Sequence, residues 1–307
     1  MRKLITRLIP RDPGRSFVIG VPYLWLILFF LVPFLIVLKI SMSEMQVGVP
    51  PFKPLFGWAD NFLSVRIYLG NLFSLFDVAN DNLYAITYLS SLKYAAFTTL
   101  LCLFIGFPFA YFLARSRPTI RPVLMMLVML PFWTSFLLRV YSWKGILANH
   151  GVLNNLMLWL GVIDEPVRML HTTFSMMVGM VYVYLPFMVL PLYANLVKLD
   201  MRFLEAAADL GATPWRAFWL ITVPLSKSGI IAGSMLVFIP CVGEFVIPDL
   251  LAGPETLMIG RVLWDELFSN NDWPRAAAVA VVTILLIIVP LAIFNKYQAE
   301  QQGGGRT

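Results

Sequence analysis

The chain alternates between long apolar blocks without charged residues and shorter polar connections. Each block is close to the roughly 17 to 25 residues that a helix needs to cross the hydrocarbon core of a bilayer, where a helix satisfies its own backbone hydrogen bonds. The blocks are residues 17–38, 94–114, 122–138, 172–197, 228–243 continuing past Glu244 to 248, and 276–295. The pattern predicts an all-α, polytopic membrane protein with six transmembrane helices, some of them kinked by proline.

Composition supports this prediction. Of the 307 residues, 59% are hydrophobic and only 13% are charged, and the mean hydropathy is +0.79. Soluble domains carry about 25% charged residues, so a soluble fold is excluded, as are collagen and a disulfide scaffold.

The distribution of charge predicts the orientation. Basic residues outnumber acidic ones 14 to 5 in the two end segments and in the second and fourth connections, whereas residues 41–92 of the first connection and the third and fifth connections together hold 7 basic and 11 acidic residues. Basic segments stay in the cytoplasm, so both termini are expected there. The expected organisation is a basic tail over 1–16, a membrane domain over 17–295 with a cytoplasmic loop over 198–227, and a disordered cytoplasmic tail over 296–307. The net charge of +6 then reflects topology rather than nucleic-acid binding.

Catalytic and nucleotide-binding motifs are absent from the sequence. There is no Gly-rich loop ending in Gly-Lys-Ser/Thr, no His-Glu-x-x-His and no Gly-x-Ser-x-Gly. His150 and His171 have no further ligands near them in sequence, so no metal site is expected. The chain is expected to bind no cofactor and to be no enzyme.

The cytoplasmic loop over 198–227 is far longer than a simple connection between two helices requires. An Ala-rich helix is expected to end at Gly211, and Thr213 with Pro214 can start a second helix that bears an aromatic face. On these features alone the loop is either a projecting, shape-specific structure or an amphipathic hairpin on the membrane surface.

Six positions of this loop resemble a motif of the inner-membrane permease subunits of ABC importers. The motif is Glu-Ala-Ala, three residues, Gly, nine residues, Ile, one residue, Leu-Pro. It is matched by Glu205, Ala206, Ala207, Gly211, Ile221 and Pro224, with Val223 in place of the leucine. The resemblance implies the type I importer permease fold in a bacterial inner membrane and a coupling helix that docks on a separate ATPase dimer, which would hold ATP and Mg.

Other segments are similar to polyamine permeases. They are 131–141, 185–191 and 243–248, whereas 151–164, 229–240, 258–264 and 272–274 most resemble PotH-type putrescine permeases. This resemblance implies putrescine import by alternating access, with a second homologous permease and a periplasmic polyamine-binding protein as partners.

A dication needs acids and aromatic faces along its path. Glu244, in the outer part of the fifth span, either contacts the cation or bonds to a broken helix end near Pro240 or Pro248. Asp249 is an interfacial residue or a substrate contact. Trp133, Tyr141 and Tyr184 either line a cation–π path or anchor the helices at the interface.

Three alternatives remain open at this point. The chain could be a secondary amine transporter driven by an ion gradient, with Glu244 as its ion site. It could be a scaffold that moves no solute. Within the ABC class, the substrate could be spermidine or another amine.

Overall fold

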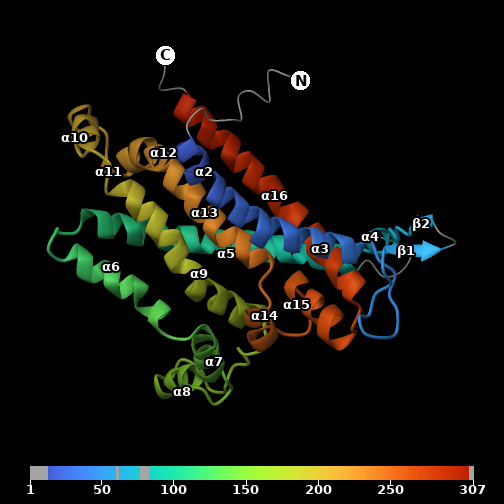
Figure 1. Ribbon diagram of the computed structural model, residues 1–307. Helices are drawn as coiled ribbons and strands as arrows, with labels where there is room; N and C mark the ends of the chain where they lie inside the picture. Colours follow the sequence, from blue (N-terminus) through green and yellow to red (C-terminus); the bar gives the residue numbers. More distant parts are fainter. Residues whose placement is uncertain (1–12, 60–61, 77–82, 304–307) are drawn as a thin grey trace. The chain divides into compact units, whose positions relative to one another are not determined.

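The computed structural model describes residues 13–59, 62–76 and 83–303 (Figure 1). The chain forms two compact units, Met1–Asn80 with Asp265–Val282, and Asp81–Trp264 with Thr283–Thr307.

The first unit holds the N-terminal helix and a long connection. Its elements are α2 (Pro13–Leu26), the π-helical turn η1 (Ile27–Leu31), α3 (Val32–Ser41), β1 (Phe56–Ala59), β2 (Phe62–Val65), α4 (Gly70–Ser74), the π-helical turn η4 (Asp265–Ser269) and the start of α16 (Trp273–Gly303). Asn71 Nδ2 donates to the carbonyls of Ser41 (3.1 Å) and Ser43 (2.7 Å), which ties α4 to the end of α3. At the start of α16, Asp272 Oδ1 accepts from the Arg275 amide at 3.0 Å.

The second unit is a helical bundle. Its elements are α5 (Leu83–Arg115), α6 (Arg121–Met129), the 3-10 turn η2 (Leu130–Trp133), α7 (Phe136–Ile146), α8 (Val152–Trp159), α9 (Thr173–Leu196), α10 (Arg202–Asp209), α11 (Pro214–Ala217), the π-helical turn η3 (Phe218–Thr222), α12 (Val223–Leu225), α13 (Lys227–Val242), α14 (Val246–Leu251), α15 (Ile259–Trp264) and the later part of α16.

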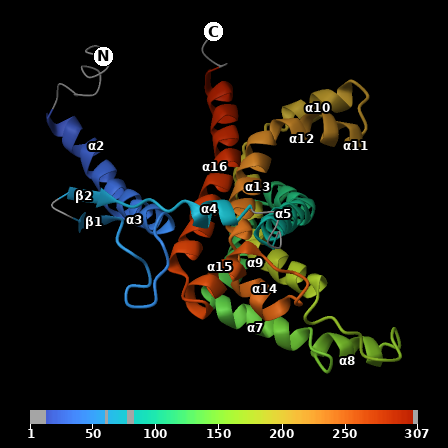
Figure 2. The same cartoon turned by 90° about the vertical axis from the view of Figure 1, so that its right-hand side faces the viewer.

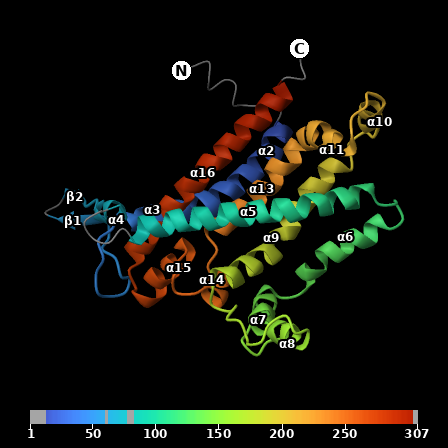
Figure 3. The ribbon, with the colours of Figure 1, turned by 180° about the vertical axis from the view of Figure 1, so that it is seen from behind.

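The core of the second unit lies where α5, α9 and α13 pack together, as Figures 2 and 3 show from two sides. Glycines let these helices approach closely. A Cβ added at Gly233 would lie 2.8 Å from Met188 Sδ and 3.1 Å from the Met188 carbonyl oxygen, and one at Gly106 would lie 3.1 Å from Met188 Cγ. Met188 therefore fills the space that glycine leaves on both α13 and α5, which is the small-residue packing typical of membrane helices.

The predicted all-α membrane fold is confirmed, and the structure adds one short hairpin in which β1 and β2 pair antiparallel. Among the described residues, four helices are long and apolar enough to cross a membrane: Phe17–Ser41, Leu83–Arg115, Thr173–Leu196 and Trp273–Ala292. Two further helix pairs, Arg121–Trp133 with Phe136–Ile146 and Pro214–Leu225 with Lys227–Val242, pass only together. Six spans result if each bent pair is one span.

The third span over 122–138 is bent, as its internal Pro131 predicts, but it is broken rather than merely kinked: the chain turns by 89° between η2 and α7, and the second helix runs on to Ile146. Pro131 has no N–H to continue the α-helical bonding, so the helix tightens to a 3-10 turn. Thr134 then adopts an extended backbone, and its Oγ1 donates to the Pro131 carbonyl at 2.8 Å. Ser135, also non-helical, precedes the first residue of α7.

Two further expectations on helix ends are corrected. The fifth helix does not continue past Glu244: α13 ends at Val242, and α14 begins at Val246 after a turn. Disorder over 296–307 is wrong for 296–303, which continue α16 to Gly303. Gln, Ala, Glu and Lys favour a helix there, and no proline follows Pro290. Residues 304–307 and most of the tail over 1–16 lie outside the described residues.

The packing at Met188 predicts that Gly233→Val destabilises the bundle. The added methyl groups would collide with a backbone oxygen, which cannot move as a flexible side chain can, so we expect a loss of about 1 to 3 kcal/mol. Thermal unfolding of the purified chain in lipid nanodiscs measures this. Gly145→Ala is the control, because a Cβ there meets nothing within 4 Å and alanine favours the helix. Equal melting temperatures for the two variants would contradict close packing.

Candidate functional site

The loop over 198–227 forms two short helices joined by a tight turn, and Figure 1 shows α10 and α11 at the opposite end of this unit from α7 and α8. The turn is a Schellman motif. The Gly211 amide donates to the Ala208 carbonyl (2.9 Å), and the Ala212 amide donates to the Ala207 carbonyl (2.9 Å). Gly211 has a φ of 80°, a conformation that glycine adopts without strain. The predicted C-cap is therefore confirmed.

The second helix begins as the sequence predicts. Thr213 is the N-cap of α11, its Oγ1 accepts from the Arg216 amide at 3.4 Å, and Pro214 occupies the first turn. The six motif positions divide between surface and interior. Glu205, Ala206, Gly211 and Pro224 are exposed, Ile221 is half-buried and Ala207 is buried.

Large apolar side chains cover the outer surface of this loop. Leu210 is 89% exposed, Trp215 70% and Leu220 72%. Large apolar side chains that are exposed to this extent are typical of a contact site for a protein or a membrane.

Phe218 connects the loop to the bundle. Its ring packs edge-on against Phe107 (5.4 Å between centroids) and Tyr111 (6.2 Å) of α5. Trp215 and Trp219 pack against the other sides of Phe218, at 6.0 and 5.3 Å. The sequence places all three aromatics on one apolar face, whereas the structure directs Phe218 inward and leaves the two tryptophans exposed.

At the other end of the unit, Glu244 holds the break between α13 and α14. Its Oε1 accepts from the backbone amides of Phe245 (3.1 Å), Val246 (3.0 Å) and Ile247 (3.4 Å), and its Oε2 accepts from the hydroxyl of Tyr184. The carboxylate thus satisfies the amides that a helix start leaves without intrahelical partners. The sequence left two roles open for Glu244. The geometry corresponds to one of them, a hydrogen bond to a broken helix end.

Two serines form hydrogen bonds with the backbone of the segment that follows, from α14 to α15. Ser175 Oγ donates to the Leu251 carbonyl at 2.6 Å, at the end of α14, and Ser91 Oγ accepts from the Ile259 amide at 2.7 Å, at the start of α15. Both serines are fully buried in long apolar helices, α9 and α5. Sequence reasoning missed them because neither stands out: Ser91 follows Ser90 outside the block over 94–114, and Ser175 follows Thr172 and Thr173 at the start of its block.

Aromatic rings extend from Tyr184 toward the bend of the third span. Tyr184 lies 6.2 Å from Phe187, and Phe187 packs edge-on against Phe132 of η2 at 5.2 Å. The guanidinium of Arg139 lies over Phe132, 5.4 Å from the ring centroid. The structure therefore brings Glu244 and Tyr184 together and adds three residues to the group, all of them within segments singled out in the sequence.

The remaining candidates lie apart from this group. Asp249 is exposed and forms an ion pair of 3.6 Å with Arg261. Trp133 is 72% exposed and Tyr141 53% exposed, and Lys144 lies 6.0 Å from the Tyr141 ring centroid. Exposed aromatics of this kind suit the interfacial anchor role.

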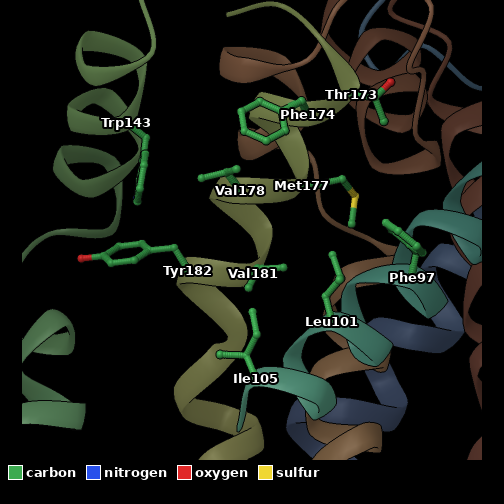
Figure 4. Close-up of a pocket in the computed structure, with 10 residues that line it drawn as sticks. All are labelled: Phe97, Leu101, Ile105, Trp143, Thr173, Phe174, Met177, Val178, Val181 and Tyr182. Atoms are coloured by element: carbon green, nitrogen blue, oxygen red, sulfur yellow. The ribbon is translucent and has the colours of Figure 1, made fainter. Parts of the chain in front are cut away.

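A groove of about 530 Å³ runs between α5, α7 and α9 (Figure 4). It is lined by Phe97, Leu101, Ile105, Trp143, Thr173, Phe174, Met177, Val178, Val181 and Tyr182. Figure 4 shows Trp143 and Tyr182 at one side of the groove and α5 side chains at the other. Since this lining has no acid, the groove does not suit a dication.

His150 and His171 line a separate hollow of about 330 Å³ together with Arg168. A neighbouring arginine opposes metal binding, and within residues 13–59, 62–76 and 83–303 no group of three or more His, Cys, Asp or Glu can hold a metal ion.

The fold and the bent spans define a multi-span membrane permease. The chain belongs to the family described as "Binding-protein-dependent transport system inner membrane component", which matches residues 103–300. It is therefore a multi-pass protein of the bacterial inner membrane.

Relatives and solved structures agree with this family. The chain is 38% identical over 283 residues to the spermidine/putrescine transport system permease protein PotB of Haemophilus influenzae, covering 92% of this chain and 93% of the relative. It is 38% identical to PotB of Escherichia coli over 88% of this chain and 92% of the relative. The fold matches a chain of a bacterial ABC transporter that imports alginate, with a TM-score of 0.68, 16% identity and coverage of 94% and 98%. A second structure of a bacterial alginate transporter, in complex with a periplasmic protein that binds an alginate pentasaccharide, has a TM-score of 0.68 at 17% identity, covering 93% of this chain and 95% of its own. The type I importer permease fold is confirmed.

The hydrogen bonds of Glu244 predict a difference between two substitutions. Glu244→Ala removes the acceptor of three amides, so we expect faster hydrogen exchange at 245–247 and a loss of about 0.5 to 2 kcal/mol, as for other lost caps. Glu244→Gln keeps one carbonyl acceptor and should retain most of the protection. Hydrogen exchange with mass spectrometry on the protein in nanodiscs measures this, and Asp249→Ala is the control. Unchanged exchange in Glu244→Ala would exclude the capping role.

Proposed function

We propose that this chain is a transmembrane permease subunit of an ATP-driven importer for polyamines, with both termini and the loop over 198–227 in the cytoplasm. The identity of 38% to spermidine/putrescine permeases, over 92% of the chain, supports this proposal most strongly. Spermidine and putrescine are both proposed substrates. The resemblance to PotH-type permeases favours putrescine, and the printed names of the relatives include both amines.

The loop is the proposed coupling site. The exposed side chains of Leu210, Trp215 and Leu220 offer an apolar surface for a cleft of a separate ATPase subunit, which binds ATP and Mg. The motif residues build the loop that presents this surface: Glu205, Ala206 and Ala207 lie in α10, Gly211 in the turn after it, Ile221 in η3 and Pro224 in α12. Phe218 conveys loop movement to α5 through its ring contacts.

The proposed partners complete an importer. They are a second homologous permease, a dimer of ATPase subunits and a periplasmic polyamine-binding protein. In this arrangement the polyamine passes the group formed by Tyr184, Glu244 and the rings beside them. Alternating access follows from movement of the bent helices around this group.

Uptake of labelled spermidine and putrescine into proteoliposomes that hold all four components tests the function. We expect uptake to require ATP and every component. Uptake that continues without the ATPase and collapses with an uncoupler would instead indicate a secondary transporter, and an intact complex that moves neither amine would contradict polyamine import.

The coupling role predicts that Gly211→Val abolishes uptake while membrane insertion persists. Valine at a φ of 80° is strained by about 1 to 2 kcal/mol, which distorts the turn that sets the two loop helices.

Gly161→Val is a matched control for this substitution. Gly161 has a φ of 67° and also ends its helix in a Schellman motif, with bonds from Gly161 and Val162 to the carbonyls of Leu158 (3.1 Å) and Met157 (3.0 Å). The strain is thus the same but lies outside the loop. ATP-driven uptake and co-purification of the ATPase are measured, and equal uptake in the two variants would contradict the docking role.

A further inference from the structure

Arg139 is a cation that this chain holds with aromatic rings. Its guanidinium carbon lies 5.4 Å from the centroid of Phe132 and 5.9 Å from that of Phe136. Its Nε and Nη1 atoms are buried and have no hydrogen-bond partner among the described residues. Arg139 is half-buried, and within that part of the chain no acid pairs with it, so the two ring faces are the contacts that this chain offers to its charge.

An arginine in a membrane-spanning region ordinarily pairs with an acid or with backbone carbonyls, because a desolvated charge is costly. Cation–π contacts are weaker than a buried ion pair and impose little direction on the cation. The guanidinium can therefore be exchanged for another cation at modest cost. Each ammonium group of a polyamine is such a cation.

The neighbourhood extends this cation site toward an acid. Phe132 contacts Phe187, Phe187 lies against Tyr184, and the Tyr184 hydroxyl donates to Glu244. Ring faces carry negative potential and Glu244 carries negative charge, so the part of the group from Phe132 to Glu244 attracts cations. Arg139 is the basic residue at its far end.

The two rings over Arg139 come from opposite sides of the bend in the third span. Phe132 belongs to η2, and Phe136 belongs to the first turn of α7, beyond the extended Thr134 and Ser135. A change of the 89° bend therefore changes the separation of the two rings. The affinity of this site for a cation depends on the conformation of the bend, as alternating access requires.

We propose that the faces of Phe132 and Phe136 form a subsite for one ammonium group of the transported polyamine, and that Arg139 occupies this subsite while no substrate is bound. The proposal rests on the proposed function and adds a specificity-determining residue to it. Arg139 acts as an internal competitor: a polyamine must displace the guanidinium to enter, which weakens retention of the substrate.

There is a competing explanation for the lack of an acidic partner for Arg139 in this chain: a carboxylate of the second permease could pair with it. Nε and Nη1 are covered by this chain itself, whereas Nη2 is not among the buried atoms and Arg139 is half-buried. Such a carboxylate could therefore bond only to Nη2 unless Arg139 moved, and the experiment distinguishes the two explanations.

Equilibrium binding of labelled spermidine to the permease–ATPase complex in nanodiscs, without the binding protein, tests the subsite. Arg139→Gln removes the competitor and keeps a side chain of similar length. We expect affinity to rise by about 2- to 30-fold, the change that corresponds to one cation–π contact. Arg139→Met is a second neutral variant, to be used if glutamine impairs folding. Lys93→Gln is the control, because Lys93 also lies over a ring, 5.7 Å from the centroid of Tyr94, but is exposed.

The variant Phe132→Leu shows whether the gain in affinity on Arg139→Gln depends on the ring contact or on the general repulsion between Arg139 and the positively charged polyamine. Leucine keeps the apolar volume and removes the ring face, so the gain from Arg139→Gln should shrink in the Phe132→Leu background and disappear when Phe136→Leu is added. A gain that persists there would show long-range electrostatics and overturn the subsite. No gain, together with loss of the second permease during purification, would show that Arg139 pairs with an acid of that partner.

Uptake by the wild-type complex is measured in parallel. If the wild type transports no polyamine, the proposed function fails. If it transports polyamine while Arg139→Gln and Arg139→Met bind spermidine no better than the wild type, only the subsite fails.

Discussion

A helix that breaks inside a bilayer must find partners for its freed backbone groups within the protein, because no water is available there. This constraint determines the architecture around the candidate site. The break after α13 persists because Glu244 accepts from three amides at the start of α14. Ser175 and Ser91 bond to the backbone at the end of α14 and the start of α15. One carboxylate and two hydroxyls therefore fix a segment that a continuous helix would otherwise replace.

The bonds of Ser175, Ser91 and Tyr184 require a rigid frame, since each joins residues at least 60 positions apart in sequence. Glycine packing supplies it: Gly233 and Gly106 both admit Met188, so α13 and α5 close on α9 from two sides. The frame then sets the positions of Ser91 on α5 and of Ser175 and Tyr184 on α9, which meet the segment after α13. Packing and polar bonding are thus interdependent, as is usual for buried polar groups.

The sequence was sufficient for those features that depend on local composition. Apolar length located the spans, and Gly211, Thr213 and Pro214 predicted the turn between the loop helices. It was insufficient where a tertiary contact decides. The role of Glu244 was left open between two interpretations, because its partner Tyr184 lies 60 residues away and in another helix.

The sharpness of the bend at Thr134 and Ser135 was missed for a different reason, since Pro131 predicted a kink but not a break of 89°. Local chemistry there does indicate a break, since a proline precedes two residues that bond readily to nearby backbone. An apolar count cannot detect it, because the block stays apolar across the bend. For the same reason Arg139 was counted as a loop charge, although the bend places it over two rings.

The relation between the coupling loop and the candidate site depends on which helices are continuous. The route along the chain from the loop to Glu244 is interrupted by a bend of 66° before α13 and ends at the turn after it. α5 runs without a break for 33 residues, about 50 Å at 1.5 Å per residue. Phe218 contacts α5 near one end, at Phe107 and Tyr111, and Ser91 near the other end holds α15. If the loop has the proposed coupling role, its displacement would reach α15 more directly through α5, a stiff element, than through α13, whose ends absorb rotation at their bends.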